Sequence, residues 1–471
     1  MRGVITGKSL MPDLAGKTVR TTIMHAPIPG SVEIVADALV VIDETGEIAS
    51  VRKPDDAAYS ETLAKARDGG GLVETGRHQY LLPGFVDLHI HAPQWPQLGK
   101  ALDVPLEVWL QTHTFPLEAR YADIDFARRI YGNLVASLLA HGTTTALYFA
   151  TIHQTATRIL AEICLDLGQR ALIGKVAMDD PDQCPDFYRD ADAEAALDGT
   201  RAFIDHVQSM PANRNRMIRP VVTPRFIPSC TDKVLTGLGE IAAQTGCHVQ
   251  THCSESDWEH DYVLQRTGRT DTQALDGFGL LSRHTILAHS NLLTDPDMDL
   301  IAERGAGIAH CPLSNFYFSN AVFPLRRALE KSLRVGLGTD ISGGPSASML
   351  DSARYAVTAS RALEEGVNPR APAETRGVAQ SRIDFRQAFH LATAGGADVL
   401  DLPVGRIAKG CQFDAILIDA DAPAAPILVE DDADTLDDVL QKIVNNATRA
   451  NIATTWVSGR QVSAGAVLRS D

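Results

Sequence analysis

The chain lacks any apolar run long enough to cross a membrane. A spanning helix needs about 20 consecutive, mostly apolar residues, and no stretch of the 471 residues meets that requirement. Residues 1–8 also lack the apolar segment that a secretory signal peptide contains. These absences lead us to expect a soluble, cytoplasmic protein that does not bind membranes.

The chain also lacks paired cysteines. Its seven cysteines are scattered, and no two form a Cys-x-x-Cys motif. Disulfide frameworks and thiolate zinc sites both need regular cysteine spacing. The pattern therefore indicates reduced thiols, in agreement with a cytoplasmic location.

Positive charge is scarce as well. The formal net charge is -16 and no basic arm is present, which argues against a nucleic acid partner. Neither Gly-x-Gly-x-x-Gly nor a Walker A motif occurs, so no phosphate-binding loop of these types is expected. The chain as a whole has 45% apolar and 22% charged residues. This is the composition of an ordinary globular enzyme.

Eight short apolar runs recur along the middle of the chain. They lie at 83–90, 143–150, 171–178, 219–223, 247–252, 284–289, 306–310 and 334–340. Amphipathic helical stretches separate them, for example at 124–141, 153–168 and 231–245. Eight strand–helix repeats predict an α/β fold of the (β/α)8 TIM-barrel type. A doubly wound open sheet is the alternative, but it seldom needs eight units.

The two ends of the chain have a β-rich pattern. Residues 32–51 predict two strands around a turn, and 413–418 and 454–462 predict further strands. We expect these ends to form one small discontinuous β-sandwich domain. The predicted domains are therefore 1–80 and 403–471 for the sandwich and 81–402 for the barrel. The polar stretch 54–80 is predicted to be largely a surface loop.

Histidines and one aspartate end several of the barrel runs. His89 and His91 close the first run and, being two residues apart on a strand, point the same way. His252, His289 and Asp340 each end a later run. TIM-barrel active sites form at the carboxyl ends of the strands, so these side chains should meet. Imidazoles and a carboxylate favour one zinc ion, with iron as the alternative.

Three of the polar residues have expected catalytic roles. Asp340 can bind the metal and accept a proton from the attacking water. Glu255, three residues beyond His252, can act as general acid and base. His289 either ligates the metal or orients the water, and the sequence leaves both roles open.

Several longer stretches resemble a known family. The run from Pro83 to His91, the Ala-His pair ending at His289 and Gly-Thr-Asp340 resemble the amidohydrolase superfamily. Within it, the chain resembles the guanine deaminases. The stretches that carry this narrower resemblance are His91-Ala-Pro-Gln94, 105–110, 114–118, 142–153, 175–179, Val222-Thr-Pro-Arg-Phe226, 309–315 and 336–344.

The resemblance implies a zinc-dependent, homodimeric enzyme that hydrolyses guanine. It implies zinc on His89, His91, His252 and Asp340, with His289 beside the attacking water. It also implies a purine surrounded by Gln94, Arg225, Phe226 and Glu255, next to His91, His252 and Asp340. Cys253 and Ser256 depart from the usual family residues beside Glu255.

Two alternatives remain open and a third is excluded. The same machinery could act on another purine or a halogenated triazine. The chain could be a non-catalytic scaffold, although such relatives typically lose metal ligands. The smaller zinc deaminases, which use His-x-Glu with Pro-Cys-x-x-Cys, are excluded because neither string occurs.

Overall fold

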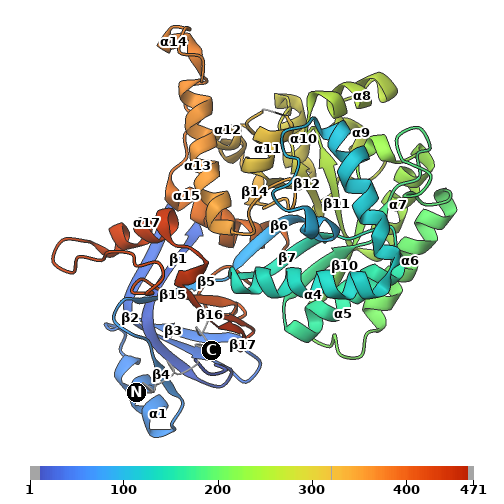
Figure 1. Ribbon diagram of the computed structural model, residues 1–471. Helices are drawn as coiled ribbons and strands as arrows, with labels where there is room; N and C mark the ends of the chain where they lie inside the picture. Colours follow the sequence, from blue (N-terminus) through green and yellow to red (C-terminus); the bar gives the residue numbers. More distant parts are fainter. Residues whose placement is uncertain (1–10, 320, 465–471) are drawn as a thin grey trace, which may run out of the picture.

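A closed barrel of parallel strands forms the larger part of the protein (Figure 1). The computed structural model describes residues 11–319 and 321–464. The barrel strands are β6 (Phe85–His91), β7 (Thr143–Phe149), β8 (Arg170–Gly174), β10 (Ile218–Pro224), β11 (His248–Cys253), β12 (Thr285–His289), β13 (Gly307–His310) and β14 (Arg334–Leu337). A short strand, β9 (Val176–Ala177), also pairs with β10.

The barrel strands pair in chain order from β6 to β14. A parallel bridge between Ile90 and Ile341 closes the ring, and the His91 N–H donates to the Ile341 carbonyl at 2.7 Å. The eight runs predicted from the sequence coincide with the eight barrel strands. The expected TIM barrel is confirmed.

Helices surround the barrel on its outside (Figure 1). They are α4 (Ile124–Ala140), α5 (Gln154–Leu167), α6 (Ala193–Ser209), α7 (Asp232–Thr245), α8 (Asp257–Thr267), α9 (Asp271–Gly277), α10 (Asp295–Arg304), α11 (Pro312–Phe318), α12 (Leu325–Glu330) and α13 (Met349–Glu365). Helix α7 shows why they begin and end where they do. The Thr231 side chain accepts from Val234 N, and Gly246 ends the helix at φ 66°. No helix in the described ranges is long and apolar enough to span a bilayer.

One connection is much longer than the others and lies between β6 and α4. It contains η1 (Ala92–Gln97), α2 (Leu106–Trp109), η2 (Leu110–Thr114), α3 (Phe115–Ala119) and η3 (Arg120–Ala122). Because it leaves the carboxyl end of β6, it is positioned to line that end of the barrel.

The opposite end of the barrel is closed by the segment after α13. This segment contains α14 (Ala373–Arg376), α15 (Phe385–His390), η5 (Leu391–Gly395) and α16 (Gly396–Val399). His248, the first residue of β11, lies 3.2 Å from the Leu400 carbonyl through its Nε2. Val399 packs with Leu147, Leu172 and Ile286 in one buried cluster. The amino ends of the strands are therefore sealed with apolar side chains.

A second, curled sheet lies beside the barrel and is built from both ends of the chain (Figure 1). Its strands are β1 (Thr18–Ile28), β2 (Ser31–Ile42), β3 (Ile48–Arg52), β4 (Leu72–Glu74), β5 (Gln79–Pro83), β15 (Ala415–Asp419), β16 (Ile452–Val457) and β17 (Arg460–Ala464). Strand β5 pairs with β1 on one side and with β15 on the other. The smaller β domain built from both ends is confirmed, and its strands form one continuous sheet.

The domain limits themselves stay a prediction. We propose the same segments, 1–80 with 403–471 and 81–402, because β5 ends and β6 begins within a few residues of the first limit. Residues 1–10 and 465–471 of these segments lie outside the described residues. A buried ion pair, Arg170 Nε to Asp414 Oδ2 at 3.0 Å, joins the barrel to the second sheet.

The prediction of a surface loop at 54–80 was wrong. This stretch contains helix α1 (Tyr59–Asp68), strand β4 and the first two residues of β5. The Tyr59 hydroxyl donates to the Asp37 carbonyl at 2.8 Å and anchors the helix to β2. The helix is mostly polar, so hydrophobic periodicity could not reveal it. The remaining elements near the C-terminus are α17 (Leu436–Asn446) and η6 (Arg449–Asn451).

Candidate metal centre and substrate pocket

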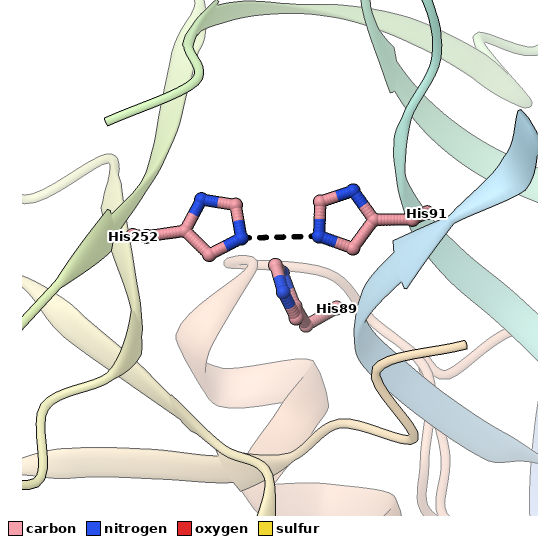
Figure 2. A group of neighbouring side chains, drawn as sticks. All are labelled: His89, His91 and His252. Atoms are coloured by element: carbon pink, nitrogen blue, oxygen red, sulfur yellow. Dashed lines mark hydrogen bonds between the residues drawn. The ribbon is translucent and has the colours of Figure 1, made fainter. Parts of the chain in front are cut away.

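Histidines from three strands converge at the carboxyl end of the barrel. His89 and His91 come from β6, His252 from β11 and His289 from β12. Figure 2 shows the first three pointing toward one another, with the Nε2 atoms of His91 and His252 at 3.0 Å. One nitrogen from each of these three rings lies within 4.8 Å of the others. The geometry expected from the His-x-His spacing is present.

Asp340 completes this group from the segment after β14. Its Oδ1 lies 3.2 Å from His89 Nε2 and 3.6 Å from His91 Nε2. Its N–H donates to the His89 carbonyl at 2.9 Å, which fixes the two segments together. Gly338 permits this approach, since a Cβ there would lie 2.8 Å from the His89 Cβ.

His252 is held in the tautomer that binds metals, and the three imidazoles are neutral. His252 Nδ1 donates to the Arg225 carbonyl at 2.6 Å, which leaves its Nε2 as a lone-pair donor. Burial lowers the pKa of His89, His91 and His252 well below the ordinary value, and their neighbouring imidazoles lower it further, as do Arg225 and His289. These rings are therefore neutral, as ligands must be.

The arrangement fits a metal ion. Among the described residues, the buried Nε2 of His89 has no hydrogen-bond partner. The Nε2 atoms of His91 and His252 face each other, and a cation between them can accept a lone pair from each. Ligands of a tetrahedral zinc lie about 2.0 Å from it and hence about 3.3 Å from one another, close to the observed 3.0 Å. The donor set therefore suits a nitrogen- and oxygen-binding metal such as zinc.

His289 lies at the edge of this group. Its Nδ1 donates to Asn315 Oδ1 at 2.9 Å, so its Nε2 carries a lone pair. That Nε2 lies 3.7 Å from Glu255 Oε1 and 3.9 Å from Asp340 Oδ2. His289 thus faces the space between the two carboxylates, where a water would be held.

Glu255 lies on the short loop between β11 and α8. Its N–H donates to Glu259 Oε2 at 2.8 Å, and its carbonyl accepts from Asn291 Nδ2 at 2.9 Å. Burial raises the pKa of Glu255 well above its ordinary value, and the charge of Asp340 adds to the rise. A carboxyl group with a raised pKa can take up a proton and release it again.

A pocket opens beside these groups. Its lining residues are His91, Gln94, Leu106, Trp109, Leu110, Arg225, Phe226, His252, Glu255, Phe318, Asp340 and Gly343. All seven residues that the sequence assigned to the substrate are among them. The pocket therefore joins the histidine cluster to a guanidinium, an amide and an aromatic ring.

Sequence reasoning missed several residues around this pocket. Leu106, Trp109 and Leu110 come from the long connection after β6, and Phe318 ends α11, where its ring lies 5.0 Å from that of Trp109. Glu118, a buried partner of Arg225, was also missed. The stretches 105–110 and 114–118, which resemble the family, were the signal that pointed to this connection.

The geometry agrees with comparisons to known proteins. Residues 80–462 match the model of the amidohydrolase family. A probable guanine deaminase of Schizosaccharomyces pombe is 37% identical over 94% of this chain and 82% of its own length. The guanine deaminase of Homo sapiens is 36% identical over 96% of this chain and 97% of its own.

A solved structure shows the same similarity. It is a crystal structure of the guanine deaminase from C. acetobutylicum with guanine bound in the active site. It superposes with a TM-score of 0.82 at 28% identity, covering 94% of this chain and 99% of that one. The chain therefore belongs to the amidohydrolase family and, within that family, groups with the guanine deaminases.

Proposed function

We propose that the protein hydrolyses guanine to xanthine and ammonia with the help of one zinc ion. The observation that carries the proposal is the pocket, which places purine-binding groups beside a cluster of metal ligands. Similarity to guanine deaminases over nearly the whole chain supports the same reaction. The proposed ligands are His89, His91, His252 and Asp340.

The chain's own residues can carry the protons of this reaction. Zinc held by these ligands would lower the pKa of the attacking water to about 7. Asp340 accepts a proton from the attacking water. The lone pair on His289 Nε2 accepts a hydrogen bond from this water and orients it. The water oxygen bonds to C2 of guanine and forms a tetrahedral carbon.

Glu255 completes the exchange. It carries the other proton of the water to the ring nitrogen N3 and then passes the proton that Asp340 accepted to the amino group on C2. The C2–N bond then breaks, and ammonia leaves while C2 becomes a carbonyl. Both protons of the water are thereby accounted for, one on xanthine N3 and one on ammonia.

Three residues are proposed to hold the purine. Guanine presents O6 and N7 as hydrogen-bond acceptors along one edge, and Arg225 and Gln94 offer N–H donors in the pocket. Phe226 offers a ring face and lies with its centroid 5.9 Å from that of Trp258. This edge recognition would place the C2 amino group toward the metal cluster.

Metal removal tests the proposed chemistry. We expect a chelator to abolish the ultraviolet change that accompanies guanine conversion, and zinc to restore it at about one ion per chain. Elemental analysis of the purified protein provides the stoichiometry. Full turnover by the metal-free protein would disprove the proposed centre.

A panel of ring substrates tests the proposed specificity. Guanine should be hydrolysed with a higher kcat/KM than adenine, 2-aminopurine or chlorinated and aminated triazines. Guanine is expected to be preferred because its O6 and N7 acceptors match the N–H donors that Arg225 and Gln94 offer. A triazine preferred over guanine would show that the pocket serves another heterocycle.

Arg225→Lys should weaken guanine binding. Lysine keeps the positive charge beside Glu118 but lacks the planar fork of N–H donors. Loss of one hydrogen bond from a charged donor costs about 1.5–3 kcal/mol, which corresponds to a roughly 10- to 100-fold fall in kcat/KM. Steady-state kinetics check this, and unchanged kinetics would place the Arg225 donors away from the substrate.

The remaining expectations concern the assembly and the compartment. We propose a homodimer, as the family resemblance implies, and sedimentation of the purified protein tests it. A cytoplasmic location is supported by seven free cysteines, five of them buried. The net charge of -16 supports the absence of a nucleic acid partner.

A further inference from the structure

A completely buried carboxylate lies directly behind the pocket. Glu118, in α3, has no exposed surface. Its Oε2 accepts from Arg225 Nη1 at 2.7 Å, and its Oε1 accepts from Arg225 Nη2 at 3.3 Å. Oε1 also accepts from Gln94 Nε2 at 2.9 Å. Both oxygens of Glu118 are therefore used by the two donors proposed to bind the purine edge.

Glu118 fixes the direction in which these donors point. The Gln94 Oε1 accepts from Ser342 N at 3.3 Å, so both ends of the amide are held. The Arg225 guanidinium lies 5.0 Å from the centroid of the Phe115 ring. Glu118 occupies one of the two amide N–H groups of Gln94 and two of the five N–H groups of Arg225. One amide N–H of Gln94 and three N–H groups of Arg225 lie outside these contacts.

Arg225 needs a counter-ion because its side chain is only 3% exposed. Burial alone would lower the pKa of Arg225, but the charge and hydrogen bonds of Glu118 raise it above its ordinary value. A buried guanidinium without a partner is strongly destabilising. A bidentate carboxylate also restricts the plane of the fork, so the partner sets orientation as well as charge.

We propose that Glu118 is a positioning residue that aligns Arg225 and Gln94 on the O6/N7 edge and thereby sets selectivity for 6-oxo purines. It does not line the pocket, so it acts through these two residues without touching the substrate. The inference rests on the proposed function, since the edge belongs to guanine. Glu118 is then the group that makes the pocket selective for purines that carry O6.

Glu118→Gln tests the proposal. Glutamine keeps the shape and one acceptor oxygen but loses the charge and the second acceptor. We expect the KM for guanine to rise about tenfold or more, while kcat changes less than about threefold. Inhibition by hypoxanthine, which carries O6, should weaken in parallel with the KM. Inhibition by purine, which lacks O6, should stay close to that of the wild type.

A matched control separates positioning from stability. Asp414→Asn removes the charge from another buried arginine pair, Arg170 with Asp414, which lies outside the pocket. It should lower the unfolding temperature without moving the KM. Equal effects of Glu118→Gln and Asp414→Asn on KM and on hypoxanthine inhibition would overturn the proposal.

Two further variants keep the test decisive. If Glu118→Gln does not fold, Glu118→Asp retains the charge but withdraws the carboxylate by one methylene, and it should still raise the KM. In a double variant with Arg225→Lys, the KM should be close to that of the worse single variant, because both changes disturb one contact. Additive effects would overturn the proposal. Failure of the wild type to hydrolyse guanine would instead reject the proposed function.

Discussion

Asp340→Asn is expected to remove guanine hydrolysis almost entirely, by about 10⁴-fold or more. Asp340 lies within 3.6 Å of two histidine nitrogens and faces His289 at 3.9 Å. The substitution removes a metal ligand charge and the acceptor of the water proton together. Measurement of kcat at saturating zinc checks the result.

Asparagine is the better replacement because of the backbone. Asp340 has φ 49°, a left-handed conformation that Asn tolerates and Ala adopts at a cost of about 1–2 kcal/mol. The Asn variant should therefore keep the N–H bond to His89 and unfold close to the wild-type temperature. Wild-type turnover in the zinc-loaded variant would reject Asp340 as ligand and base.

The barrel and the histidine cluster could be predicted because both follow from periodicity and topology. Parallel strands of a barrel bring their carboxyl ends to one rim. A polar residue at the end of an apolar run, such as His252 on β11, must therefore lie near that rim. The two-residue spacing of His89 and His91 adds a shared direction.

The back of the pocket could not be predicted in this way. Glu118 lies in the long connection after β6, whose short helices have no dominant period, and it meets Arg225 across 107 positions of the sequence. A helix of four to six residues carries too little pattern to define its buried face. Only the contact itself identifies Glu118 as the partner of Arg225.

The two unusual residues beside Glu255 have local structural explanations. Ser256 is the N-cap of α8 and accepts from Glu259 N at 3.3 Å. Serine and asparagine cap helices about equally well, so the departure preserves the cap. Cys253 Sγ lies 3.7 Å from Thr272 Oγ1, in contact with α9. Neither departure removes a group from the pocket.

Glu255→Gln is expected to slow deamination by about 10²–10⁴-fold while zinc content stays unchanged. Glutamine keeps the shape of the side chain and can still donate and accept hydrogen bonds. It cannot carry a proton from the water to N3 and then to the departing amine. Because guanine binding depends on Arg225 and Gln94, the KM should change much less than kcat.

Glu259→Gln provides the matched control for this prediction. Glu259 is a fully buried glutamate in α8, four residues after Glu255; its Oε2 accepts from the Glu255 N–H and it does not line the pocket. Glutamine retains an oxygen for that bond, so kcat should fall less than about tenfold, below the range for a lost general acid–base group. Single-turnover rates and elemental analysis distinguish the two variants. If Glu255→Gln loses zinc and turns over normally once reloaded, Glu255 supports the metal site and carries no protons.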